Sequence, residues 1–92
     1  MVLVRCHIFV SGRVQGVFFR QSTRVMAIKN NVNGLVRNLD DGRVEIIAEG
    51  ETQNIDNLVT WCKTGPANSR VDEFELLDED FTGEFENFDV RY

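Results

Sequence analysis

The sequence predicts an α+β fold in which two helices cover one face of a mostly antiparallel sheet. Three observations support this prediction: strand-like alternation near the N-terminus, a hairpin signal in the middle of the chain, and one clearly amphipathic helix after the hairpin. The 92 residues are enough for one domain, which we expect to span residues 1–92.

The first two segments are a strand and a helix. Residues 3–11 alternate between apolar and polar side chains, which is typical of a half-buried strand. Residues 19–31 show helical periodicity, but two apolar stripes match it almost equally well, so the pattern leaves the buried face open. One stripe contains Phe19, Thr23, Met26 and Ala27, and the other contains Phe18, Val25, Ile28 and Val32. The helix is expected to end at Asn30-Asn31, because Asn tolerates a left-handed backbone conformation.

The middle of the chain predicts a β-hairpin followed by a helix. Residues 34–39 and 43–49 flank the sequence LDDGR, and Asp-Gly between two apolar runs is a strong hairpin signal. The next segment repeats apolar residues at i, i+3, i+4 and i+7, which predicts an amphipathic helix ending at Gly65-Pro66. The repeating positions are Ile55, Leu58, Val59 and Cys62.

Two further strands are expected at residues 70–77 and 86–92. On the last of them, Phe88, Val90 and Tyr92 share one face. The first six elements follow the βαββαβ order of a ferredoxin-like sandwich, and the seventh is an additional C-terminal strand.

Composition and charge exclude several classes of protein. No apolar run approaches the roughly 20 residues that a membrane span needs, and the N-terminus lacks the features of a signal peptide, so we expect a cytoplasmic protein. Two cysteines, Cys6 and Cys62, are too few for a secreted disulfide framework and are expected to be half-buried thiols. With His7 as the only histidine, they match no zinc pattern. The net charge of −5 argues against nucleic acid as a partner.

The sequence SGRVQGVFFRQS, residues 11–22, is the best candidate for a binding site. A helix that begins near Phe19 leaves its first amides unpaired, and a preceding glycine turn can aim further amides at the same point. Gly12 and Gly16 allow a positive φ there. Arg20 adds a planar guanidinium suited to phosphate or carboxylate. Spacing alone leaves open the alternative of an ordinary turn with a surface arginine.

The residues needed for other phosphate chemistries are missing. The two glycines are one residue too close for a Walker loop, and no Gly-Lys-Ser/Thr follows them. His7 lies on a predicted strand, where a surface or half-buried position is expected, so it is a poor candidate for a general base. If the protein is an enzyme, it therefore suits a substrate that is already activated.

Two motifs resemble a known family. GRVQGVFFR, residues 12–20, is similar to the first signature of the acylphosphatases, G-x-V-Q-G-V-x-F-R. GLVRNLDDGRVEI, residues 34–46, is similar to their second signature, G-x-V-x-N-x-x-x-G-x-V-E. The likeness continues through residues 65–71 and 88–92, so it covers nearly the whole chain.

This resemblance implies a ferredoxin-like fold and hydrolysis of acyl phosphates to a carboxylate and inorganic phosphate, without a metal or an organic cofactor. The family's catalytic arginine falls on Arg20, and its catalytic asparagine, which orients the attacking water, falls on Asn38. The family's phosphate-binding loop falls on Gln15, Gly16, Val17, Phe18, Phe19 and Arg20. The implied partners are a small acyl phosphate and inorganic phosphate as product and competitor, and the expected state is a monomer that binds neither nucleic acid nor membrane.

The chain departs from the family pattern at a few positions. Phe18 replaces a small residue, commonly glycine, and Gln21 replaces a frequent aromatic residue. Arg37, which is available to steer substrate, replaces the usual lysine, and Asn30-Asn31 replaces a more usual apolar-glycine helix end. Neither catalytic position is lost, and Phe18 is expected to reshape the mouth of the pocket.

Two other functions compete with hydrolysis. A non-catalytic anion-binding regulatory domain needs the loop and Arg20 but has no use for Asn38 in its motif. An RNA-binding module needs exposed aromatic side chains on its central strands. Residues 43–49 contain no aromatic residue, and Phe9 is alone on the outer face of residues 3–11, so this possibility is the weaker of the two.

Overall fold

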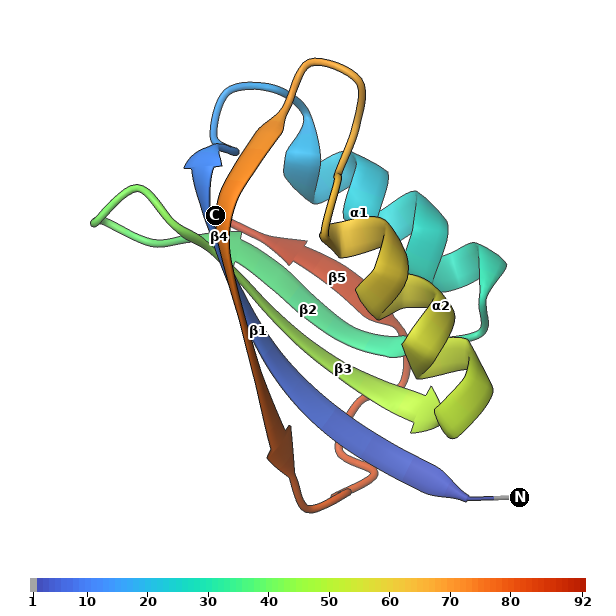
Figure 1. Cartoon of the computed structure of the whole chain (residues 1–92). Helices are drawn as coiled ribbons and strands as arrows, with labels where there is room; N and C mark the ends of the chain where they lie inside the picture. Colours follow the sequence, from blue (N-terminus) through green and yellow to red (C-terminus); the bar gives the residue numbers. More distant parts are fainter. Residues whose placement is uncertain (1) are drawn as a thin grey trace.

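Five strands form one sheet in the order β4-β1-β3-β2-β5, and both helices lie on the same face of it (Figure 1). The computed structural model describes residues 2–92. The predicted order of elements and the additional C-terminal strand are confirmed. The elements are β1 (Leu3–Arg13), α1 (Phe19–Lys29), β2 (Asn33–Asn38), β3 (Val44–Glu51), α2 (Thr52–Cys62), β4 (Arg70–Glu79) and β5 (Phe88–Arg91).

The strand directions bring three strand ends to the same edge of the sheet. β1 and β2 are both antiparallel to β3, whereas β5 is parallel to β2. β1, β2 and β5 therefore run in the same direction, and their last residues, Arg13, Asn38 and Arg91, lie at one edge. The chain leaves β1 there and enters α1, so residues 14–18 and the start of α1 belong to the same end of the molecule (Figure 1).

The core lies between the sheet and the two helices. The alternation expected for residues 3–11 is confirmed, because Cys6, Ile8 and Val10 are buried beneath the helices. The core contains Cys6, Ile8, Val10, Val14, Val17, Phe19, Ala27, Val32, Val36, Val44, Ile46, Ala48, Ile55, Leu58, Cys62 and Phe88. Burial of this apolar surface is the main stabilising contribution to the fold.

Tertiary packing decides which stripe of α1 faces the core. Phe19, Thr23 and Ala27 are buried, whereas Val25 and Ile28 are exposed at 61% and 53%. Of the two stripes that the periodicity allowed, the first is therefore the buried one. The helix ends as expected: Asn30 follows its last residue, and the following residue, Asn31, has a φ of 55°.

The prediction of half-buried thiols was wrong, because both cysteines are fully buried. Cys6 lies on the helix-covered face of β1 and Cys62 lies at the end of α2 on its buried face. Burial raises the pKa of Cys6 to about 12, and it also raises the pKa of Cys62. Both therefore remain protonated and unreactive near neutral pH.

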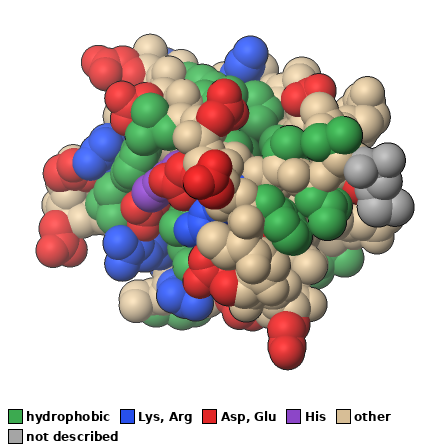
Figure 2. Space-filling model, turned by 90° about the horizontal axis from the view of Figure 1, so that it is seen from below, with side chains coloured by type: hydrophobic (Ala, Val, Ile, Leu, Met, Phe, Trp, Pro, Cys, Tyr) green, Lys and Arg blue, Asp and Glu red, His purple; other side chains and the backbone are tan. Residues whose placement is uncertain are grey.

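The face of the sheet away from the helices carries a network of charged side chains. In Figure 2, the view from below, His7 lies among acidic and basic side chains. The segment between β4 and β5 is held against this face by Glu49, which is only 3% exposed. The carboxylate of Glu49 accepts hydrogen bonds from the backbone N–H groups of Thr82 and Gly83 at 2.9 and 3.1 Å and pairs with Arg5 at 3.3 Å. These donors compensate for the cost of burying the carboxylate.

Neither α1 nor α2, the helices found within residues 2–92, has the length and apolar character needed to cross a lipid bilayer.

Candidate active site

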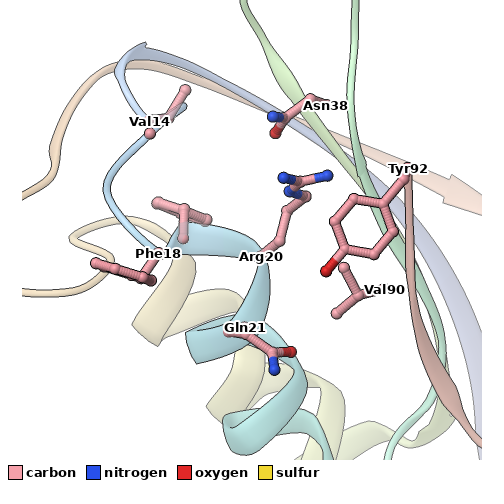
Figure 3. A pocket seen from close by; sticks show the side chains of 9 residues that line it. Val14, Phe18, Arg20, Gln21, Asn38, Val90 and Tyr92 are labelled. Carbon is pink, nitrogen blue, oxygen red and sulfur yellow. The ribbon is translucent and has the colours of Figure 1, made fainter.

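A cavity of about 330 Å³ opens at the edge of the sheet where β1, β2 and β5 end. Its walls come from the loop after β1, the first turn of α1, the last residue of β2 and the C-terminal segment (Figure 3). The lining residues are Val14, Gly16, Phe18, Phe19, Arg20, Gln21, Asn38, Val90 and Tyr92. Elements far apart in the sequence thus contribute to one pocket, as the strand directions require.

In the part of the chain that the structure describes, the loop before α1 contains backbone amides without a backbone partner next to this pocket. Gly16 has a φ of 74° and Phe18 a φ of 62°, so two residues with left-handed backbone conformations flank Val17. Turns that contain such residues can form an anion-binding nest of backbone N–H groups. A Cβ atom at position 16 would meet nothing within 4 Å, so glycine is needed there for its backbone conformation and not for space. Within residues 2–92, no backbone acceptor pairs with the N–H groups of residues 15–20. The positive end of the α1 dipole lies at the same place.

Arg20 is held at the pocket by the C-terminal segment. Its Nη1 donates a hydrogen bond to the backbone carbonyl of Arg91 at 3.2 Å. Its guanidinium carbon lies 4.5 Å from the centroid of the Tyr92 ring, which is a cation–π contact. One carbonyl and one ring face therefore orient the guanidinium, and its remaining N–H groups stay available for an anion.

Asn38 and Arg20 line the same pocket from different elements. In Figure 3, the carboxamide of Asn38 points toward the guanidinium of Arg20. The Oδ1 atom of Asn38 is buried and has no hydrogen-bond partner among the described residues. Buried polar atoms are rarely left unpaired, so an orphaned carboxamide oxygen on a residue that lines a cavity points to a partner supplied by a ligand or a water.

The structure places the predicted loop residues in two groups. Gly16, Phe18 and Phe19 line the pocket, as does Arg20. The side chains of Gln15 and Val17 do not line it, and Val17 is 8% exposed and belongs to the core. Whatever these two residues contribute to an anion must come from the backbone.

Sequence reasoning missed the role of Tyr92 at the pocket. The alternation of the last strand places Tyr92 on one face with Phe88 and Val90. No pattern in the sequence indicates that the Tyr92 ring stacks on the guanidinium of Arg20. Val14, Gln21 and Val90 are further lining residues that spacing did not identify.

Other candidate residues lie away from the pocket or are already paired. His7 is on the opposite face of the sheet, where its ring nitrogens lie 2.8 and 3.0 Å from carboxylate oxygens of Glu45 and Glu79. This half-buried position agrees with the expectation for His7. Arg37, which was available to steer substrate, pairs with Glu45.

Fold and site together define a ferredoxin-like domain with a small pocket built from a loop, a helix N-terminus and the ends of parallel strands. A family model described as Acylphosphatase matches residues 6–90. The chain therefore belongs to the acylphosphatase family, and it is an enzyme that hydrolyses acyl phosphates.

Similar proteins extend over the whole length of the chain. An acylphosphatase of Syntrophus aciditrophicus is 44% identical over 91 residues, covering 99% of this chain and 95% of that protein. An acylphosphatase of Rubrobacter xylanophilus is 52% identical over 87 residues, covering 95% of this chain and 79% of that protein. The crystal structure of acylphosphatase from Bacillus subtilis superposes with a TM-score of 0.92 at 36% identity, covering 99% of this chain and all of that one. This likeness confirms the predicted fold class.

Proposed function

We propose that Arg20 and the N–H groups of residues 15–20 bind the phosphoryl group of the acyl phosphate, and that Asn38 holds the attacking water. The observation that carries this proposal is the buried, unpartnered Oδ1 of Asn38 in the same cavity as Arg20. A carboxamide oxygen accepts a hydrogen bond from water and thereby orients its lone pair.

In the proposed reaction, the water oxygen forms a bond to phosphorus while the bond between phosphorus and the carboxyl oxygen breaks. The electron pair of the broken bond leaves with the carboxylate, which is a good leaving group. Arg20 and the loop amides stabilise the charge on the phosphoryl oxygens without reorganising during the reaction.

Asn38 orients the water but does not deprotonate it, because an amide has no useful proton affinity near neutral pH. A proton of the water passes to an oxygen of the substrate. This chemistry needs positioning and charge stabilisation more than a protein base, so His7, on the opposite face of the sheet, takes no part in it.

A non-catalytic anion-binding domain is the less favoured alternative. Such a domain would use the loop and Arg20, but it would have no need for a buried carboxamide oxygen left without a partner in the pocket. We further infer that the enzyme acts as a cytoplasmic monomer that binds neither nucleic acid nor membrane, a state supported by its net charge of −5.

Kinetics with benzoyl phosphate test the two site residues. Asn38→Ala is expected to lower kcat by about 10²-fold or more, as the loss of a preorganised group does, while inhibition by inorganic phosphate stays nearly unchanged. Arg20→Lys keeps the charge but loses the planar fork, so both phosphate inhibition and kcat are expected to fall strongly.

Arg70→Lys is the matched control for Arg20→Lys, because Arg70 pairs with Asp72 on β4 and does not line the pocket. Full activity of Asn38→Ala would remove the role assigned to that residue. The assays contain EDTA, and a requirement for an added divalent cation would contradict the metal-independent reaction. Phosphate binding without any turnover by the wild-type protein would favour the non-catalytic alternative.

A further inference from the structure

The side chain of Gln15 uses both of its N–H donors within the protein, so only its backbone N–H remains to donate a hydrogen bond to a substrate. Its Nε2 donates hydrogen bonds to the backbone carbonyls of Leu39 and Arg43, both at 2.9 Å. A carboxamide nitrogen carries two N–H bonds, so both are used. Gln15 is half-buried, and its side chain does not line the cavity.

The two carbonyls that Gln15 binds lie at the base of the β2–β3 turn. The N–H of Leu39 donates to the carbonyl of Arg43 at 2.8 Å, and the N–H of Gly42 donates to the carbonyl of Leu39 at 3.2 Å. Gln15 therefore adds two bonds at the point where the hairpin leaves the sheet. Asn38 is the residue immediately before Leu39 and the last residue of β2.

We propose that Gln15 is a positioning residue that fixes Asn38 relative to the loop before α1. The proposal rests on the function assigned above to Asn38 and to the amides of residues 15–20. The water would be held by Asn38 at the end of β2, whereas the phosphoryl group would be held by the loop. These groups belong to separate elements, and Gln15 joins the two elements through hydrogen bonds.

Reaction rates depend steeply on the distance between the attacking water and the phosphoryl group. A misplacement of about 1 Å between reacting groups can cost roughly 10²-fold in rate. The turn itself is exposed at Asp40, Asp41 and Gly42, so packing alone does not hold it. The contact of Arg43 with the ring of Phe9, at 4.6 Å from the centroid, anchors the other side of the hairpin to β1 but not to the loop.

Gln15→Met tests the proposal, because methionine keeps the length and volume of the side chain but donates no hydrogen bond. With benzoyl phosphate, kcat is expected to fall about 10-fold while KM changes by less than about 3-fold, since alignment is lost and phosphate binding is kept. Gln53→Met is the matched control, because Gln53 is exposed on α2, and its one side-chain hydrogen bond among the described residues is to Asn57. Circular dichroism and urea unfolding verify that each variant folds.

A double-mutant cycle separates positioning from a general structural effect. In the Asn38→Ala background, Gln15→Met is expected to lower kcat by less than about 2-fold, because the residue through which it acts is already gone. An equal loss in both backgrounds would overturn the proposal, and so would an unchanged kcat in the single variant. A rise in KM with kcat unchanged would show that Gln15 is a substrate ligand instead.

Hydrogen exchange provides a readout that does not depend on activity. Gln15→Met is expected to speed exchange of the Leu39 and Gly42 amides by about 10-fold, while exchange in α2 stays unchanged. Unchanged exchange at these amides would overturn the proposal. If the wild-type protein does not hydrolyse benzoyl phosphate, the function assigned to Arg20 and Asn38 fails, and the exchange rates still decide whether Gln15 holds the hairpin.

Discussion

Phe18 illustrates how much a single backbone conformation can cost. Its φ of 62° lies in the left-handed region, which disfavours residues with a Cβ by about 1–2 kcal/mol. Its ring is 79% exposed and buries little apolar surface in return. The conformation is required because residue 18 is the last residue of the loop, directly before α1, and turns the chain into the helix.

Phe18→Gly is therefore expected to stabilise the protein. The relief of the left-handed conformation exceeds the additional entropy of glycine in the unfolded chain, leaving a net gain of roughly 0.5–1 kcal/mol in the free energy of unfolding. Phe18→Val is expected to lose roughly 1–2 kcal/mol, because β-branched residues tolerate this region least. Urea unfolding measures both variants.

Val25→Gly is the control for the loss of an exposed apolar side chain at a helical φ. It is expected to destabilise the protein by roughly 0.3–0.5 kcal/mol, because glycine is about 1 kcal/mol and valine about 0.6 kcal/mol less favourable than alanine in a helix interior. A loss of stability in Phe18→Gly equal to that in Val25→Gly would show that the backbone of Phe18 is not strained.

At the scale of elements, the short strand β5 organises the pocket. It is an edge strand of four residues, and within residues 2–92 its one partner strand is β2. Two arginines of α1 bind its backbone carbonyls, Arg24 that of Phe88 and Arg20 that of Arg91. The helix that supplies the guanidinium is thus attached to the strand that orients it, and Tyr92 extends this strand over Arg20.

Tyr92→Ala tests the contribution of the ring. An exposed cation–π contact is worth about 0.5–1 kcal/mol, so KM for benzoyl phosphate is expected to rise by about 2-fold to 5-fold. Stability should change by less than about 0.5 kcal/mol, because the side chain is 97% exposed. Steady-state kinetics and urea unfolding measure the two effects.

Tyr92→Phe is the control, because it keeps the ring and removes the hydroxyl. It is expected to behave like the wild-type protein. Unchanged kinetics in Tyr92→Ala would mean that the carbonyl of Arg91 suffices to orient Arg20.

At the scale of the whole molecule, the charged face of the sheet makes the fold sensitive to acid. Burial acts to raise the pKa of Glu45, but hydrogen bonds from Arg37 and His7 outweigh it, and the pKa lies below its ordinary value. Hydrogen bonds from Arg5 and His7 lower the pKa of Glu79. A carboxylate whose pKa is lowered on folding stabilises the folded state above the ordinary pKa, and this contribution is lost as the pH falls through the lowered value.

The free energy of unfolding is accordingly expected to be level above about pH 5 and to fall as the pH is lowered toward 3. Glu45→Gln should reduce stability at pH 7 by roughly 1–3 kcal/mol, the range for losing charge-assisted hydrogen bonds, and should show a smaller further loss toward pH 3. Urea unfolding between pH 3 and pH 7 measures this dependence without adding salt.

Glu75→Gln is the control, because Glu75 is exposed on β4 and makes no ion pair within the described chain. Its pH dependence is expected to match that of the wild-type protein. If the free energy of unfolding of Glu45→Gln falls between pH 5 and pH 3 as steeply as that of the wild type, other carboxylates cause the acid sensitivity.

The sequence by itself determined the features that depend on local spacing. Three patterns depend only on residues that are close in the sequence: the alternation in residues 3–11, the Asp-Gly turn and the amphipathic repeat of α2. These patterns predicted β1, the hairpin and α2. The two family signatures likewise identified Arg20 and Asn38, which the structure brings into one pocket. Arg20 and Asn38 meet because β1 and β2 run in the same direction, so the loop after β1 and the last residue of β2 lie at the same end of the sheet.

Only the tertiary structure decided the features that depend on distant contacts. The buried stripe of α1 is selected by the sheet beneath it, because helical periodicity alone allowed two. The bond from Gln15 to Leu39 joins residues 24 positions apart, and that from Arg20 to Arg91 joins residues 71 apart. Such contacts arise from the packing of whole elements, and no local pattern in the sequence encodes them.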